Sequence, residues 1–223
     1  MRPRSPALGL PGNAREAALF VAVAAVSADA LAWGVQLALG VPRATDLWAL
    51  SKGLLLVAGV GFVALVARSP AMGIFALVFG LVALEDWLVL HAQMGRRLAT
   101  VPALADLAHR LGVSDNAWGQ FLSLLLLSAV GGVAAVWATF RMVNVRRRVG
   151  LSLLLLLLGL FLFAGPVDLY SDMYGALATV EEVGETLALS AAVGYSSGLV
   201  VMTGLGFRLR DEREEGRLKR RER

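Results

Sequence analysis

Long apolar runs, separated by short polar connections, set the pattern of this sequence. Six runs of roughly 20 residues are long enough for an α-helix to cross a bilayer. Because they are apolar nearly all round, they are not the one-faced helices of a soluble domain. The pattern predicts an all-α, polytopic membrane bundle of six transmembrane helices. We expect these helices at about residues 17–39, 48–67, 71–91, 119–140, 149–167 and 183–206.

A different pattern occupies the longest connection, residues 92–118. From about residue 102 to 112, apolar residues recur at helical spacing and charged residues lie on the opposite side. Such a segment is typical of a short helix lying in the membrane interface. The apolar positions are Leu104, Leu107, Ala108 and Leu111, and the polar ones are Asp106, His109 and Arg110.

Composition divides the chain into three parts. Residues 1–16 form a basic leader rich in Pro and Gly, residues 17–207 form the transmembrane domain, and residues 208–223 form a tail with charges of both signs. A signal peptide is a rival interpretation of the N-terminus, because basic residues precede an apolar core and an A-x-A pattern lies at residues 30–32. The apolar run continues to Leu39, which favours a spanning helix.

The basic residues are unevenly distributed along the chain. If the N-terminus lies in the cytoplasm, 16 of the 21 Lys and Arg residues fall on the cytoplasmic side of six helices. This bias favours cytoplasmic N- and C-termini and a place in the plasma (inner) membrane. The formal net charge of +4 does not indicate nucleic-acid binding, because the basic residues gather at segment ends and in the tail. With no cysteine in the chain, disulfides, thiolate metal sites and a Cys nucleophile are excluded.

Ionisable residues recur at the opposite, outer end of the predicted helices. An ionisable group at membrane depth costs about 2.5–3.5 kcal/mol on insertion scales, so it is usually paired, buried or functional. We expect these residues to meet in an outward-facing carboxylate and histidine pocket that attracts cations. They are Asp29, Lys52, Glu85, Asp86, His91, Asp168, Asp172, Glu181, Glu182 and Glu185.

The first interpretation of this pocket is a divalent metal site, for Zn, Mn, Fe or Ca. The candidate metal ligands are Asp86, His91, Asp168 and Glu182, and the candidate catalytic residues are Glu85 and Glu185. The metal would activate water toward a lipid-like ester, amide or phosphoester, which would make the protein a hydrolase. Asp86 and His91 lie about 140° apart around an ideal helix, so both reach one centre only if this helix is surrounded there or its last turn loosens.

Two other functions compete with the hydrolase, and the sequence leaves open whether the protein is an enzyme. In a proton- or cation-coupled transporter, Asp29 and Lys52 would form a charge network with Glu85 and Asp86. In a non-catalytic structural or assembly subunit, Glu85, Asp86 and His91 would lie at the interface. They would pair there with Lys52, Arg96 and Arg97, and the partner would be another membrane subunit. Asp172 and Glu181 complete the polar pocket, but in the structural subunit Glu181 and Glu182 would only begin the last helix, where acids favour the positive end of the helix dipole. The partner common to all three is the lipid bilayer.

The distribution of acidic and His residues over several helices is similar, in kind only, to that of multi-pass metal-dependent lipid hydrolases of the alkaline ceramidase and adiponectin-receptor type. Those proteins gather acidic and His ligands from several helices, and they use three His, with an H-x-x-x-H pair late in the chain. This sequence lacks that pair and has Glu181, Glu182 and Glu185 in its last helix instead. The similarity therefore implies metal chemistry without transferring a ligand assignment.

Two smaller signals concern packing. Gly194 and Gly198 form a small-xxx-small pattern that lets neighbouring helices approach closely. Pro166, near the end of the fifth apolar run, predicts a kink there because it removes a helical hydrogen bond.

Overall fold

The computed structural model describes residues 12–39, 44–88, 90–171 and 175–204. These residues form helices joined by short turns, with no strand in the described ranges. The helices are α1 (Gly12–Leu39), α2 (Ala44–Val66), α3 (Pro70–Leu88), α4 (Leu90–Leu98), α5 (Pro102–Leu111), α6 (Asp115–Arg141), α7 (Asn144–Leu162), the π-helical turn η2 (Phe163–Val167), α8 (Asp168–Ser171) and α9 (Gly175–Gly204).

The long helices match the predicted bundle. Within the described residues, five helices are long and apolar enough to cross a membrane, and the bent pair α3–α4 makes a sixth if it is counted as one span. The five spans are Asn13–Gly34, Ala49–Val66, Asp115–Arg141, Val145–Val167 and Val180–Thr203. The prediction of an all-α, multi-pass membrane bundle is therefore confirmed. The leader before residue 12 and the charged tail lie outside the described residues.

The third predicted helix ends earlier than expected. Instead of continuing through His91, α3 ends at Leu88, and α4 leaves it at an angle of 68°. α4 carries Arg96 and Arg97 in its last turn, whereas α3 is apolar along most of its length. The chain thus changes from an apolar to an amphipathic segment at this turn.

The helix predicted at about residues 102–112 is present as α5. Pro102 starts it, where the fixed φ of proline suits the first helical turn. Gly112 ends it with a φ of 72°, and its N–H donates to the carbonyls of Ala108 and His109. Much of the remaining connection, expected as a loop, is also helical because it contains α4.

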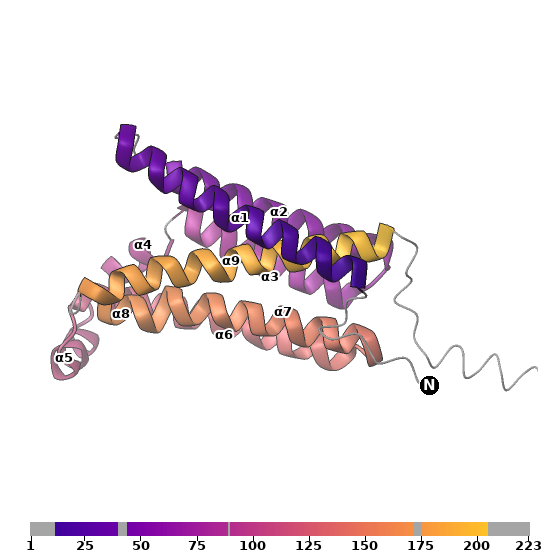
Figure 1. Cartoon of the computed structure of the whole chain (residues 1–223). Coiled ribbons are helices and arrows are strands. Elements are labelled where there is room, and N and C mark those ends of the chain that lie inside the picture. The colour runs from indigo at the N-terminus through magenta and orange to yellow at the C-terminus, as the bar shows by residue number, and fades with distance from the viewer. Residues whose placement is uncertain (1–11, 40–43, 89, 172–174, 205–223) are drawn as a thin grey trace, which may run out of the picture.

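The helices form a bundle in which both described chain ends lie together (Figure 1). The start of α1 and the end of α9 are at one end of the bundle, and α4, α5 and α8 are at the other. The main core is formed by apolar side chains from α1, α2, α3, α6, α7 and α9, including Leu56, Phe75, Leu153 and Leu199. Large apolar residues such as Phe20 and Leu65 point outward, as expected for helices that face lipid.

Gly194 allows the close helix packing that the sequence predicts, and Pro166 lies where the helical hydrogen bonding changes. A Cβ on Gly194 would lie 2.5 Å from the carbonyl oxygen of Ala18, so α9 and α1 pack at a distance that a larger residue would prevent. Pro166 lies inside the π-helical turn η2, which interrupts the regular hydrogen bonding of the fifth span. The kink expected at Pro166 stays a prediction.

Candidate functional site

The side chain of Lys52 is buried inside the bundle, with 2% of its surface exposed. Its Nζ lies 2.7 Å from Oδ1 of Asp29, an ion pair that joins α2 to α1. Asp29 is also largely buried, at 12% exposure. Each charge therefore has its opposite as a direct neighbour, which offsets part of the cost of removing both from water.

Ser190 on α9 completes this group. Its hydroxyl donates to Oδ2 of Asp29 at 3.0 Å and accepts from Nζ of Lys52 at 3.4 Å. A serine hydroxyl has one donor and two acceptor positions, so both contacts are compatible with a single proton. Asp29, Lys52 and Ser190 form a closed triangle, which we call the Asp–Lys–Ser network.

The network lies within apolar spans and not in their connections. Asp29 is five residues from the end of its span at Gly34, and Lys52 is three residues from the start of its span at Ala49. At 1.5 Å per residue these offsets are about 7.5 and 4.5 Å along the two helix axes. Charged residues inside membrane spans are rare and usually functional, and this ion pair is formed by two of them.

Close helix packing brings the side chains of Asp29, Lys52 and Ser190 within hydrogen-bonding distance. A Cβ on Gly59 of α2 would lie 2.9 Å from Oγ of Ser196 on α9, and a Cβ on Gly194 would lie 2.6 Å from the Cβ of Ala22 on α1. These glycines let α9 approach both partners. The short side chains of Asp29 and Ser190 can then meet the long side chain of Lys52.

Glu85 and His91 form a second polar pair across the α3–α4 break. Nδ1 of His91 hydrogen-bonds to Oε1 of Glu85, and the same oxygen accepts from the backbone N–H of His91 at 3.0 Å. In a continuous helix the two residues would be about 9 Å apart along the axis and on different faces. The break therefore creates this contact, and the Glu85 carboxylate satisfies an N–H at the start of α4.

The other predicted site residues are distributed differently. Glu182 is exposed on α9, and Glu181 and Glu185 are half-buried on the same helix and make contacts there. The side chains of Asp86 and Asp168, and the whole of Asp172, lie outside the described residues. Among the residues that the structure does describe, no three His, Cys, Asp or Glu side chains are placed to hold a metal ion.

Of the ten predicted residues, the structure thus joins Asp29 to Lys52 and Glu85 to His91. Ser190 belongs with the first pair but is not among the predicted pocket residues. Its only signal in the sequence is a hydroxyl in an apolar run, and serine in such a run commonly bonds to its own helix backbone. Ser196, one turn and a half further along α9, does so with the carbonyl of Val193.

No protein-family model matches this chain, and the comparisons with curated proteins and with solved structures found no match. The interpretation of the site therefore depends on its own chemistry. The Asp29 carboxylate is held between an ammonium and a hydroxyl. A cation that binds this carboxylate must compete with Lys52.

Proposed function

We propose that this chain is a proton- or cation-coupled membrane transporter in which Asp29 receives the coupling ion. The observation that carries the proposal is the Asp–Lys–Ser network, which links α1, α2 and α9 inside their membrane spans. When a proton or a small cation occupies Asp29, the ion pair with Lys52 is broken. The packing of three helices then depends on whether the coupling ion is bound.

Energetics favour a functional role for the network over a purely stabilising one. A buried ion pair is often no better for stability than apolar residues of similar size, because both charges lose their hydration. Packing alone could hold α1, α2 and α9, since Gly59 and Gly194 already allow close approach. A lysine and an aspartate at this depth are therefore better explained by ion exchange.

A non-catalytic assembly subunit is the second candidate. It is favoured by the fact that the carboxylate of Asp29 is paired within the chain, by Lys52 and Ser190. In that case the network would only fix the register of three helices. The metal-dependent hydrolase stays a prediction, because two of its four candidate ligands, Asp86 and Asp168, have side chains outside the described residues.

We further propose that both termini are cytoplasmic and that the membrane is the plasma (inner) membrane. The excess of Lys and Arg on one side of the helices supports this orientation. The start of α1 and the end of α9 lie at one end of the bundle, which supports placing both termini on one side (Figure 1).

The test is ion movement in lipid vesicles that contain the full chain. A potassium diffusion potential is imposed with valinomycin, and an enclosed pH-sensitive dye reports proton entry, with and without external sodium. We expect a flux above that of protein-free vesicles, its loss in Asp29→Asn and its reduction in Ser190→Ala. Asp106→Asn, which removes an exposed carboxylate on α5, should leave the flux unchanged.

The opposite results would overturn the proposal. They are the absence of flux with either ion, or a flux that Asp29→Asn leaves intact while the variant remains folded. Absence of flux, combined with loss of folding in Asp29→Asn, would favour the assembly subunit.

A further inference from the structure

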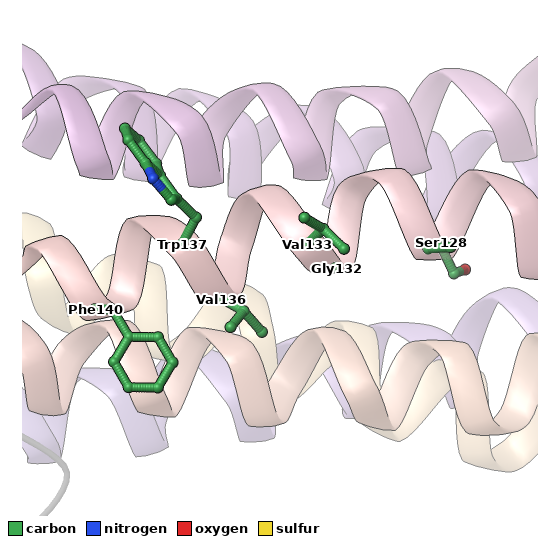
Figure 2. A pocket seen from close by; sticks show the side chains of 7 residues that line it. Ser128, Gly132, Val133, Val136, Trp137 and Phe140 are labelled. Atoms are coloured by element: carbon green, nitrogen blue, oxygen red, sulfur yellow. The ribbon is translucent and has the colours of Figure 1, made fainter.

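An open apolar groove of about 550 Å³ follows the second half of α6 (Figure 2). Gly132 leaves its floor open, because a Cβ at that position would meet nothing within 4 Å. Trp137 and Phe140 point to opposite sides near one end of the groove. The residues that line it are Ser128, Ala129, Gly132, Val133, Val136, Trp137 and Phe140.

Two arginines lie at the end of the groove that is lined by Trp137 and Phe140. The guanidinium carbon of Arg141 is 4.9 Å from the ring centroid of Trp137, and that of Arg147 is 5.4 Å from the ring centroid of Phe140. These cation–π contacts hold both exposed side chains beside the groove. In the described part of the chain, no ion pair involves either arginine.

The surrounding sequence concentrates positive charge at the same place. Residues 141–148 contain four arginines and no acidic residue. Such a cluster at the end of membrane helices attracts anionic lipid headgroups. Guanidinium groups bind phosphate well, because their planar N–H donors match two phosphate oxygens at once.

The dimensions of the groove distinguish a lipid tail from another helix. Ser128 and Phe140 are twelve residues apart, which is about 18 Å along α6. This is close to one leaflet, since the hydrocarbon core of a whole bilayer is about 30 Å thick. A spanning helix would need contact along most of α6, whereas an acyl chain needs one leaflet with a charged group at its end.

We propose that this groove binds one anionic phospholipid. An acyl chain lies along Ser128, Gly132 and Val136, and the phosphate binds to Arg141 and Arg147. The site is separate from the Asp–Lys–Ser network and does not depend on the transport proposal. It would make the stability of the α6–α7 end of the bundle depend on the lipid composition.

The test measures lipid binding to the full chain by native mass spectrometry, with phosphatidylglycerol and phosphatidylcholine of the same acyl chains. We expect tighter binding of phosphatidylglycerol by about 30-fold, as the combined attraction of two arginines implies. R141Q/R147Q should remove this preference. Gly132→Leu fills the groove and should therefore weaken the binding of both lipids. The preference for phosphatidylglycerol should be kept.

Matched controls keep the result interpretable. Arg110→Gln removes an exposed arginine on α5, and Gly34→Leu adds a side chain at another open glycine, on α1. Neither should change lipid binding. Thermal unfolding of each variant shows that it is folded, and Gly132→Leu is expected to fold because its new side chain enters open space.

Three results would overturn the proposal. The first is equal binding of the two lipids, and the second is lipid binding that Gly132→Leu leaves unchanged. The third is a wild-type dimer that Gly132→Leu converts to a monomer, because the groove would then be an interface between two copies of the chain.

Discussion

The ammonium of Lys52 lies 2.7 Å from the carboxylate of Asp29, although 23 positions separate the two residues in the chain. Ser190, a further 138 positions beyond Lys52, contacts both. One small group of polar atoms therefore joins three helices inside the membrane spans. The first two predictions follow from these contacts.

Removing one charge of the pair should cost more than removing both. Lys52→Met leaves the Asp29 carboxylate buried without its cation. We expect the free energy of unfolding to fall by about 3–5 kcal/mol. The double variant D29N/K52M removes the remaining charge and should recover most of that loss. Denaturant unfolding in detergent micelles measures the free energies, with Arg110→Met as the exposed control. A double variant that is less stable than Lys52→Met would contradict the ion pair.

Ser190→Ala should destabilise the bundle more than Ser196→Ala. Both serines are buried on α9, at 0% and 1% exposure. The hydroxyl of Ser190 bonds to a charged group on another helix, so its loss should cost about 1.5–3 kcal/mol. The hydroxyl of Ser196 bonds to its own helix at Val193, so its loss should cost less. Thermal unfolding compares the melting temperatures of the two variants. Equal decreases would show that the contact with Asp29 adds nothing to the stability of the bundle.

Gly119→Ala should separate α4 from α6. A Cβ on Gly119 would lie 2.4 Å from the carbonyl oxygen of Gly95, so one of the two backbones must move. Overpacking of this kind typically costs about 1–3 kcal/mol. Gly132→Ala is the matched control on the same helix, because its Cβ meets nothing, and it should be neutral or more stable by up to about 1 kcal/mol. Unfolding measurements that rank the two variants in the opposite order would rule out the close contact.

Glu85→Ala should loosen the start of α4. The carboxylate accepts the backbone N–H of His91, and losing such a cap typically costs about 0.5–2 kcal/mol. Hydrogen exchange followed by mass spectrometry should show faster exchange in residues 90–98. Exchange in α5, which Glu85 does not cap, should stay as it is. Unchanged protection of residues 90–98 would mean that α4 is held by its packing on α6 alone.

The fold followed from local patterns that need no knowledge of neighbours. Apolar runs of spanning length predicted the long helices, and the helical spacing of apolar residues from Leu104 to Leu111 predicted α5. The helix ends were less well predicted. α1, for example, begins at Gly12 although its apolar run starts at Ala17, because a helix continues into polar residues for as long as its backbone hydrogen bonds can form.

The break between α3 and α4 could not be predicted in the same way. The apolar run continues through Leu88 and Leu90, so periodicity alone favoured one helix to His91. The turn is accompanied by contacts with other parts of the chain. α4 packs on α6 through Gly95 and Gly119, and Glu85 folds back to His91.

By itself, the sequence determined that the chain is a multi-pass helical membrane protein and that its ionisable residues favour one end of the helices. Only the tertiary structure decided which of them meet. Asp29 and Lys52 were expected in one charge network with Glu85 and Asp86, whereas the structure pairs Asp29 with Lys52 and adds Ser190. The physical reason is that a side chain's partner depends on how each helix is rotated and how closely it packs. Those quantities are set by contacts such as Gly194 against Ala18, which no single segment of sequence contains.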